Sequence, residues 1–375
     1  RVVATESPTD LRSALEAAAR LGLAVELAGA TAPGTSAFDL PADPAGWAES
    51  LRSAQVVFDH PGLHDSIRSH AVNLTRMAAA AAPLLVERLD PELASLVGDR
   101  LVEVLATVDP DGWDHPTTRE RRMVDLRRAA LIEHGPAARL RHLMVAGGGS
   151  ASAPSVSVLL ATNRPEQIEH AIGQLERQSY PELEVVVALH GPAAARAPDL
   201  PGDIKVIEAD ASLTLGEVLQ MAVESSSGEL LSKFDDDDWY GPDHIWDLVL
   251  AREVSGAVLV GKGSEFVHLA SSEATIRRFI GGADTWTTTI GGGALLIGRQ
   301  QLDRIGGWQP LARSVDRALI EDVHRAGGRV YRTHGFGYVL ERRGSGHTWE
   351  AGDGYFLDQA ENTWPGLALD VAGVE

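Results

Sequence analysis

The chain has 375 residues, of which 44% are hydrophobic, and a formal net charge of −20. This length and apolar content predict domains with large cores and exclude a chain that is disordered throughout. The negative charge argues against a nucleic-acid partner, and the lack of cysteine excludes disulfides and thiolate metal sites while remaining compatible with a reducing compartment. We find no signal peptide and no apolar run of transmembrane length, so we expect a cytoplasmic protein without an integral membrane segment.

Short strands and helices alternate in the first part of the chain. Residues 55–59 and 83–86 are predicted strands, and residues 66–81 between them are a predicted helix. The alternation predicts a small Rossmann-like α/β domain over residues 1–145, without the Gly-x-Gly-x-x-Gly turn that would support a dinucleotide site. Residues 117–145 are predicted to form a long, Arg-rich helix. Its arginines indicate a solvated face with salt bridges or, as the alternative, a surface for an anion or a partner.

Residues 146–154, Ala-Gly-Gly-Gly-Ser-Ala-Ser-Ala-Pro, have the composition of a flexible linker and predict a domain boundary. Beyond it, strands and helices are again predicted in alternation, over residues 155–162, 166–178, 184–189, 204–207 and 215–225. This βαβ order predicts a parallel sheet, with a ligand crevice at the carboxyl ends of its strands.

Four consecutive aspartates, Asp235 to Asp238, follow a predicted buried strand over residues 229–234. A Gly-Pro turn and a predicted helix come after them. The acids therefore belong to the edge of the sheet at which open α/β folds bind ligands. Carboxylate oxygens suit Mg²⁺ or Mn²⁺, and these ions hold phosphates. The alternative is a solvated acidic turn.

Several short motifs of the second part of the chain occur in a fixed order. They are Val-Ser-Val-Leu-Leu-Ala-Thr-Asn-Arg-Pro (156–165), Gln-Ser-Tyr-Pro-Glu-Leu-Glu-Val-Val-Val (178–187), Ala-Val-Glu-Ser-Ser-Ser-Gly-Glu-Leu-Leu (222–231), Phe-Asp-Asp-Asp-Asp (234–238), Gly-Gly-Gly-Ala-Leu-Leu-Ile (291–297) and Leu-Asp-Arg-Ile-Gly-Gly-Trp (302–308). In this order they resemble the family 2 inverting glycosyltransferases, which have the A-type fold. The first part of the chain faintly resembles one half of a B-type glycosyltransferase, and we expect it to bind a partner or acceptor or to be the remnant of a second transferase.

The resemblance implies a catalytic domain over residues 155–350, followed by a C-terminal tail at 351–375. Such a domain moves a sugar from a nucleotide-diphosphate donor to a hydroxyl of a glycan, lipid-linked or small-molecule acceptor, as in cell-surface glycan or natural-product glycosylation. A divalent ion, Mn²⁺ or Mg²⁺, would neutralise the diphosphate leaving group. The resemblance places this ion on a DXD motif, Asp235 and Asp237, and adds His347, further along the chain, as another ligand. The residues that it places at the donor nucleotide are Thr162, Asn163, Arg164, Asp235 and Asp236.

Two positions depart from the family pattern. The family commonly has an acidic pair after the second strand, where this chain has His190-Gly191-Pro192. The carboxylate often placed against the base is therefore missing, and the nucleotide (UDP, dTDP, GDP or CDP) stays open. Gln220 also stands where asparagine is common.

The general base that deprotonates the acceptor hydroxyl has two candidates. The family's catalytic aspartate opens a helix eleven positions before the glycine of an Ala-Gly turn, and Asp316 has this spacing from Gly327. The pair Glu321-Asp322 is the other candidate but lies one to two helical turns later. Asp316 also suits a helix N-terminus without any catalytic role. Two neighbouring cations, Arg342 and Arg343, either meet phosphate or acceptor anions or belong to a solvated loop.

Two other functions compete with a transferase. A sugar-nucleotide-binding or scaffold module with a decayed site would need neither Asp316 nor the DXD pair. A nucleotidyltransferase also uses paired acids on an α/β sheet, but it should carry a Gly-rich, basic loop after its first strand, where this chain has Asn163-Arg164-Pro165.

Overall fold

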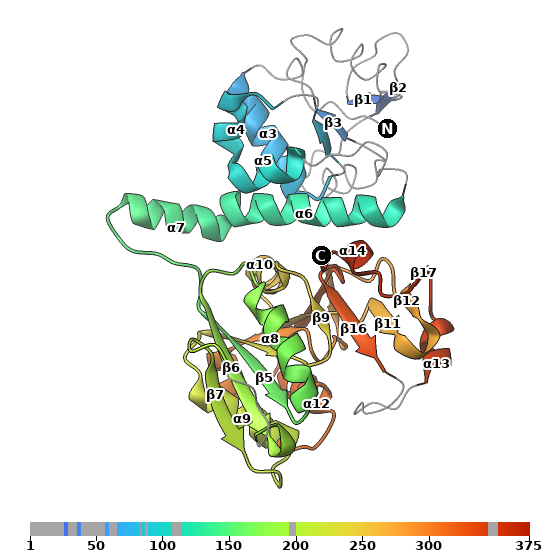
Figure 1. Cartoon of the computed structure of the whole chain (residues 1–375). Coiled ribbons are helices and arrows are strands. Elements are labelled where there is room, and N and C mark those ends of the chain that lie inside the picture. The colour runs from blue at the N-terminus through green and yellow to red at the C-terminus, as the bar shows by residue number, and fades with distance from the viewer. Residues whose placement is uncertain are drawn as a thin grey trace. The chain divides into compact units, whose positions relative to one another are not determined.

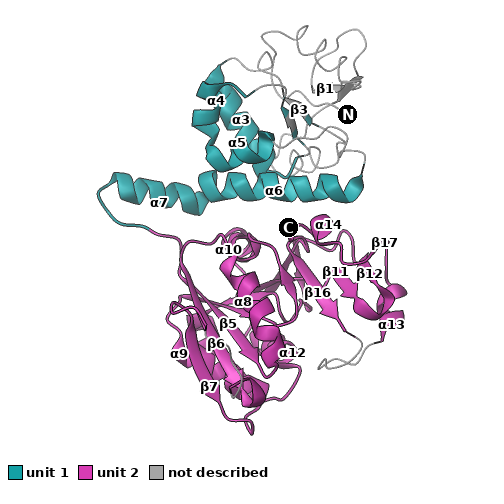
Figure 2. Cartoon of the chain, viewed as in Figure 1, with its two compact units in different colours: residues 1–151 teal, residues 152–375 magenta. Residues whose placement is uncertain are grey.

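The computed structural model describes residues 26–28, 36–38, 57–59, 66–82, 84–86, 89–106, 115–194, 200–343 and 352–375. The chain divides into two compact units, residues 1–151 and 152–375 (Figure 2). The division falls within the Gly/Ser-rich segment 146–154. Among the described residues, no helix combines the length and the apolar character needed to cross a membrane.

The first unit contains a parallel βαβ element, as the alternation of strands and helices predicts. Strands β3 (Val57–Asp59) and β4 (Leu84–Val86) pair in parallel and are joined through α3 (Ile67–Ala79), whose N-cap Ser66 accepts a hydrogen bond from the Ser69 amide. A second parallel pair consists of β1 (Glu26–Ala28) and β2 (Ser36–Phe38). The other helices among the described residues of this unit are α4 (Pro91–Val97), α5 (Asp99–Ala106), α6 (Pro116–His134) and α7 (Pro136–Ala146).

The prediction of one long helix over residues 117–145 is wrong in one respect, because this segment forms two helices. The break lies at Gly135, which has an extended backbone (φ −60°, ψ 160°) between α6 and α7. Pro136 follows it, and a proline both lacks an amide hydrogen and disfavours a helical conformation in the residue before it. Leu126 of α6 packs with Leu74, Leu93 and Leu101 in the core of this unit.

The second unit is built on an eight-stranded sheet (Figure 1). Its strands, in spatial order, are β13 (Thr285–Thr287), β15 (Val330–Thr333), β10 (Leu259–Lys262), β14 (Leu295–Gly298), β8 (Leu230–Phe234), β5 (Val156–Thr162), β6 (Leu183–His190) and β7 (Lys205–Ala209). The last four are parallel, which confirms the predicted parallel sheet, whereas β14 is antiparallel to both of its neighbours. The helices of this region are α8 (Ile168–Glu176), α9 (Leu215–Ser225), α10 (His244–Ser255), α11 (Arg299–Arg304) and α12 (Val315–Arg325).

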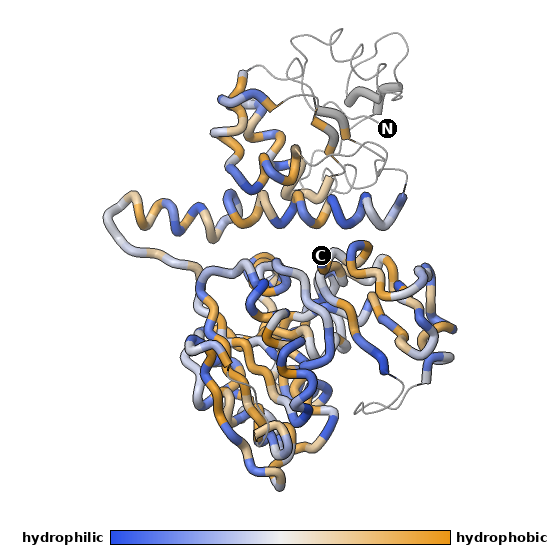
Figure 3. The backbone as a smooth tube through the Cα atoms, viewed as in Figure 1, coloured by the Kyte–Doolittle hydropathy of each residue, from blue (hydrophilic) through white to orange (hydrophobic). Residues whose placement is uncertain are grey.

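Strand composition explains why this sheet lies inside the unit. The central strands are continuous apolar runs, as is usual for parallel strands that are covered on both faces, and they are coloured mostly as hydrophobic in Figure 3. Leu159, Val186 and Leu295 contribute to one buried cluster with Leu219 of α9 and Leu319 of α12. The polar residues that follow β5 and β8 are thereby held at the carboxyl edge of a rigid sheet.

A second, five-stranded sheet completes this unit. In spatial order its strands are β17 (Asn362–Pro365), β12 (Ala274–Arg277), β11 (Phe266–Leu269), β16 (Tyr338–Arg342) and β9 (Trp239–Tyr240). The segment expected to be a C-terminal tail is folded over residues 352–375, because β17 pairs with β12 and Phe356 of α13 (Asp353–Leu357) is buried. A last short helix, α14 (Leu369–Ala372), follows β17. Since β9 begins directly after the four aspartates, the acidic run joins the two sheets.

Candidate active site

A pocket of about 490 Å³ lies at the carboxyl edge of the large sheet. Residues 162–164 at the end of β5 and residues 235–238 after β8 line it, as parallel strands require. Its other sides are closed by the glycine loop 291–293, by Asp316 of α12 and by Tyr338, Leu340, Glu341 and Arg342 of β16. Five segments that are distant in sequence therefore meet around one cavity.

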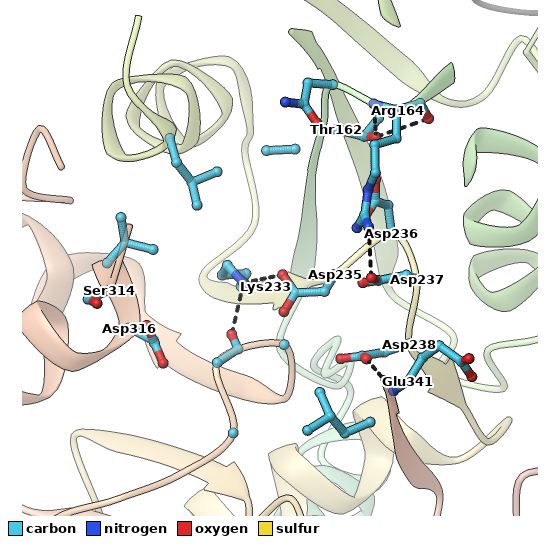
Figure 4. Close-up of a pocket in the computed structure, with 18 of the residues that line it drawn as sticks. Thr162, Arg164, Lys233, Asp235, Asp236, Asp237, Asp238, Ser314, Asp316 and Glu341 are labelled. Carbon is cyan, nitrogen blue, oxygen red and sulfur yellow. Dashed lines mark hydrogen bonds and ion pairs between the residues drawn. The ribbon is translucent and has the colours of Figure 1, made fainter. Parts of the chain in front are cut away.

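Arg164 binds two of the aspartates (Figure 4). Its Nη1 lies 2.8 Å from Asp237 Oδ2, and its Nε and Nη2 donate to the two oxygens of Asp236. Thr162 donates its hydroxyl to Asp236 as well and accepts the Arg164 amide at 3.1 Å. Burial alone would lower the pKa of Arg164, but the hydrogen bonds and charges of the two aspartates outweigh it and raise that pKa. The guanidinium is thus a fixed cation in the pocket.

Asp236 differs from its neighbours because both of its oxygens are engaged within the protein. It is 4% exposed, and burial raises its pKa although Arg164 and Thr162 act in the opposite direction. The side chain therefore orders the turn after β5. Asn163, in the same turn, is exposed at the pocket.

Lys233 is a site residue that we did not predict from the sequence. It lies in the otherwise apolar strand β8, is 5% exposed, and donates to Asp235 and, at 3.1 Å, to the carbonyl of Gly292. Burial alone would lower its pKa, but the charge and hydrogen bond of Asp235 outweigh burial and raise it, with smaller contributions from Asp316 and Asp238. Figure 4 shows its ammonium group between Asp235 and Asp316. A lysine inside a buried strand was the available signal, since such a charge needs a partner.

Asp235 has the most accessible side chain of the four acids, at 39% exposed, compared with 6% for Asp236 and 8% for Asp237. Its backbone is fixed by a hydrogen bond, in which its amide donates to the hydroxyl of Tyr240 at 2.8 Å. The same hydroxyl donates to the carbonyl of Gly293 at 2.9 Å. The carboxylate is thus presented to the pocket from a fixed backbone.

Asp238 also lines the pocket, but it is buried and connects the two sheets. Its Oδ2 accepts the hydroxyl of Tyr338 at 2.7 Å, and its Oδ1 accepts the amide of Glu341 at 3.0 Å. Burial, followed by the charges of Asp235 and Asp237, raises its pKa well above the usual range despite these hydrogen bonds. The negative charges of the run are therefore only partly balanced by the protein's own cations.

The glycine loop separates the acidic run from Asp316. A Cβ atom on Gly293 would lie 2.7 Å from Asp235 Oδ2 and 2.8 Å from Asp238 Oδ2, and one on Gly292 would lie 2.8 Å from Asp316 Oδ2. Real Cβ atoms do not approach so closely, so any side chain here would displace a carboxylate. The three glycines were visible in the sequence, but their contacts were not.

Asp316 lines the pocket, whereas its competitors do not belong to the described residues that line it. Asp316 is half-buried in the first turn of α12. Asp322 instead accepts from Gln309 at 2.7 Å and pairs with Arg325, and Glu321 pairs with Arg317 on the helix surface. Of the candidate bases, only Asp316 is therefore among the described residues that line the pocket.

The pocket's oxygen atoms fit a hard divalent cation. No cluster of three or more histidine, aspartate or glutamate ligands is preformed among the described residues. However, oxygens of Asp235 and Asp238 converge beside Gly293, and the mutual repulsion of the acids contributes to the raised pKa of Asp238. A cation bound between Asp235 and Asp237, the two acids whose charges raise that pKa, and completed by ligand oxygens would relieve that repulsion. The predicted ligand His347 lies outside the described residues.

Arg342, but not Arg343, belongs to the residues that line the pocket. Arg342 is 7% exposed and lies over the ring of Phe356, with its Cζ 5.3 Å from the ring centre. Arg343 approaches Glu341 with an N···O distance of 3.7 Å. Gln220 has a structural contact, because its Oε1 accepts the amide of Trp308 at 3.1 Å and so fixes the Gly-Gly-Trp turn.

Comparisons with known proteins give likenesses of fold. No protein-family model and no curated protein match the chain. Among solved structures, a mannosyltransferase of Pyrobaculum calidifontis in complex with GDP-Man and Mn²⁺ is 17% identical, with 58% of this chain and 68% of that chain covered and a TM-score of 0.40. TarS of S. aureus in complex with UDP-GlcNAc is 14% identical over 53% of this chain and 61% of that chain, with a TM-score of 0.41. At such values the likeness says nothing about the chemistry of this pocket.

Proposed function

We propose that the second unit is a metal-dependent inverting glycosyltransferase that acts on a nucleotide-diphosphate sugar. One observation carries the proposal: the carboxylate of Asp316 and the acidic run Asp235–Asp238 face the same pocket from opposite sides of Gly292 and Gly293. One side supplies a base and the other a cation site through which a diphosphate can be held, which are the two requirements of sugar transfer from a diphosphate.

Donor binding is assigned to the strand ends. Asp235 and Asp237 would hold Mn²⁺ or Mg²⁺ together with diphosphate oxygens, and the bound ion would supply Lewis-acid stabilisation of the leaving group. Arg164 lies beside Asp237 and adds a fixed positive charge to this region. Thr162 and Asn163 then meet the nucleoside, and Asp236 acts through Arg164 by fixing its guanidinium.

Acceptor activation is assigned to Asp316. Its carboxylate takes the proton of the acceptor hydroxyl while the acceptor oxygen forms a bond to the anomeric carbon. The bond from that carbon to the diphosphate oxygen breaks on the opposite face, the electron pair leaves with the nucleoside diphosphate, and the proton stays on Asp316. One displacement inverts the anomeric configuration. A glycan, lipid-linked or small-molecule hydroxyl satisfies this chemistry.

The test measures donor binding and product stereochemistry on the full chain. UDP, dTDP, GDP and CDP are titrated calorimetrically with Mn²⁺ and with EDTA. We expect one nucleotide to bind at least about 10-fold more tightly with Mn²⁺, on the scale of lost metal-site support. NMR of the product from the matching sugar nucleotide should show an inverted anomeric centre. Equal binding of all four with EDTA, or a retained configuration, would contradict the proposal.

A further inference from the structure

We propose that Phe279 and Tyr355, which flank Arg278, form a platform that binds a pyranose ring of a neutral oligosaccharide acceptor. We call these three residues the aromatic platform. The inference rests on the proposed function, since it names the acceptor class of that site as a glycan.

The platform exposes two aromatic rings around a buried cation. Phe279 is 46% exposed and Tyr355 47%, whereas Arg278 is 3% exposed. The Cζ of Arg278 lies 4.7 Å from the Phe279 ring centre and 6.0 Å from that of Tyr355. Arg278 also donates to Gln359 at 3.0 Å, so the guanidinium that supports both rings is fixed. The two exposed rings therefore share one fixed support.

The backbone of Phe279 is an independent sign of function. Its φ is 60°, in the left-handed region that bulky residues rarely adopt. The turn that it opens is closed by a hydrogen bond from the Gly282 amide to the Phe279 carbonyl at 3.0 Å. Asparagine or glycine would suit this position better by conformation alone, and unfavourable backbone conformations of this kind cluster at functional sites. A large ring kept here is therefore explained by a contact it makes to a ligand.

Two connections join the aromatic platform to the pocket. Arg278 Nε donates to the carbonyl of Ser264 at 2.9 Å, and Ser264 lines the pocket. Tyr355 packs edge-on against Phe356, with ring centres 5.3 Å apart. The guanidinium of Arg342, which also lines the pocket, lies over the ring of Phe356. The platform is thus linked to two residues that line the pocket, Ser264 and Arg342, and the proposal has an acceptor at Asp316 extend its chain along this side.

The chemistry of the platform matches a neutral sugar. A pyranose ring has an apolar C–H face, which an aromatic ring can cover, and hydroxyls at its edge that need hydrogen-bond acceptors. Such acceptors are present, because Glu361 accepts the amide of Ile280 at 2.9 Å beside Phe279, and Asp353 accepts from Ser271 at 2.6 Å. The chain's charge of −20 disfavours a nucleic acid as the stacking partner.

The experiment uses the full chain on an array of neutral oligosaccharides. Two single variants, Phe279→Asn and Tyr355→Ser, are compared with the control Trp286→Ser, which removes a 40% exposed aromatic ring from β13 of the other sheet. We expect the full chain to bind a subset of glycans, each platform variant to bind them at least about 10-fold more weakly, and the control to be unchanged; stacking on an aromatic ring contributes on this scale. Phe279→Asn should keep its thermal midpoint, since asparagine tolerates the left-handed backbone.

Outcomes of two kinds would overturn the inference. The first is that the chain binds no neutral oligosaccharide, whether or not it binds phospholipid vesicles instead. The second is that the Trp286→Ser control loses as much glycan affinity as the platform variants. Donor titration with Mn²⁺ keeps the two proposals apart. Both platform variants should bind the nucleotide like the unchanged chain, and glycan binding without nucleotide binding would remove the proposed function while leaving the platform.

Discussion

The hydroxyl of Tyr338 donates a 2.7 Å hydrogen bond to Oδ2 of Asp238, although the two residues are 100 positions apart. Tyr338 begins β16 of the small sheet, and Asp238 ends the acidic run that follows β8 of the large sheet. The Glu341 amide satisfies the second oxygen of Asp238 at 3.0 Å. This aspartate therefore fixes the wall of the pocket, and our proposal assigns the cation to Asp235 and Asp237.

Asp238→Asn should change how stability depends on pH. Burial and the neighbouring acids raise the pKa of Asp238 in the folded state above its unfolded value of ~3.9. The folded chain thus binds more protons above about pH 4, and this group's contribution to stability is lost as pH rises through its folded pKa. Asparagine does not titrate, so the variant does not lose this contribution. Its free energy of unfolding should therefore rise relative to that of the unchanged chain as pH rises. Urea unfolding between pH 4 and 8 measures this, and a pH-independent difference would contradict it.

Asp316→Asn should abolish most turnover without affecting donor binding. The amide keeps the shape of the side chain but cannot accept the acceptor's proton, so we expect kcat to fall roughly 10²–10⁴-fold. The matched control is Asp322→Asn, because Asp322 contacts Gln309 and Arg325 outside the pocket. Steady-state kinetics and nucleotide titration of both variants provide the readout. A larger loss in Asp322→Asn would move the base to that residue.

Two of the three glycines in the loop, Gly292 and Gly293, should affect catalysis and nucleotide binding separately. A Cβ on Gly293 meets Asp235 and Asp238, so Gly293→Ala should weaken Mn²⁺-dependent nucleotide binding. A Cβ on Gly292 meets Asp316, so Gly292→Ala should lower kcat while nucleotide affinity stays close to normal. In the control Gly173→Ala the new Cβ meets nothing within 4 Å, and alanine favours its helix by up to about 1 kcal/mol. Identical effects of the first two variants would refute this division.

Asp235→Asn and Asp237→Asn should each reduce the benefit of Mn²⁺ for nucleotide binding. An amide oxygen carries no charge, so we expect at least about 10-fold weaker binding with Mn²⁺ and little change with EDTA. Asp243→Asn is the control, since this half-buried residue contacts Ser179 and is not among the residues that line the pocket. If the two site variants bind nucleotide with Mn²⁺ as well as this control does, the cation lies elsewhere.

His347→Ala tests the ligand predicted outside the described residues. An imidazole that coordinates Mn²⁺ should improve ion affinity by about 10- to 100-fold. Activity of the unchanged chain should fall as pH drops through about 6.5, because a protonated ring cannot bind a metal. The activity of the variant should not show this fall. The exposed His324 of α12, changed to alanine, is the control. Unchanged Mn²⁺ affinity in His347→Ala would exclude this ligand.

Local pattern in the sequence determined the parallel part of the large sheet and the position of the acidic run. Apolar runs such as Val156–Thr162 and Leu230–Phe234 predict buried strands, and alternation with helices predicts their parallel order. The spacing of Asp316 from the Ala-Gly turn, which the family resemblance supplied, likewise pointed to a residue that lines the pocket. These inferences depend on residues that are neighbours in the chain, so sequence alone could support them.

Only the tertiary structure decided how the four aspartates divide their roles. Adjacent and chemically identical, they differ through partners that the fold brings from elsewhere: Arg164 to Asp236 and Asp237, and Tyr338 to Asp238. Lys233 and the glycine loop likewise belong to the site because the fold brings them together. The segment expected to be a tail is instead an edge of the small sheet, because β17 pairs with β12. Hydrogen bonds and charge interactions depend on distance in space, and over separations of 70 to 100 residues that distance is set by packing of the whole unit and not by any local pattern.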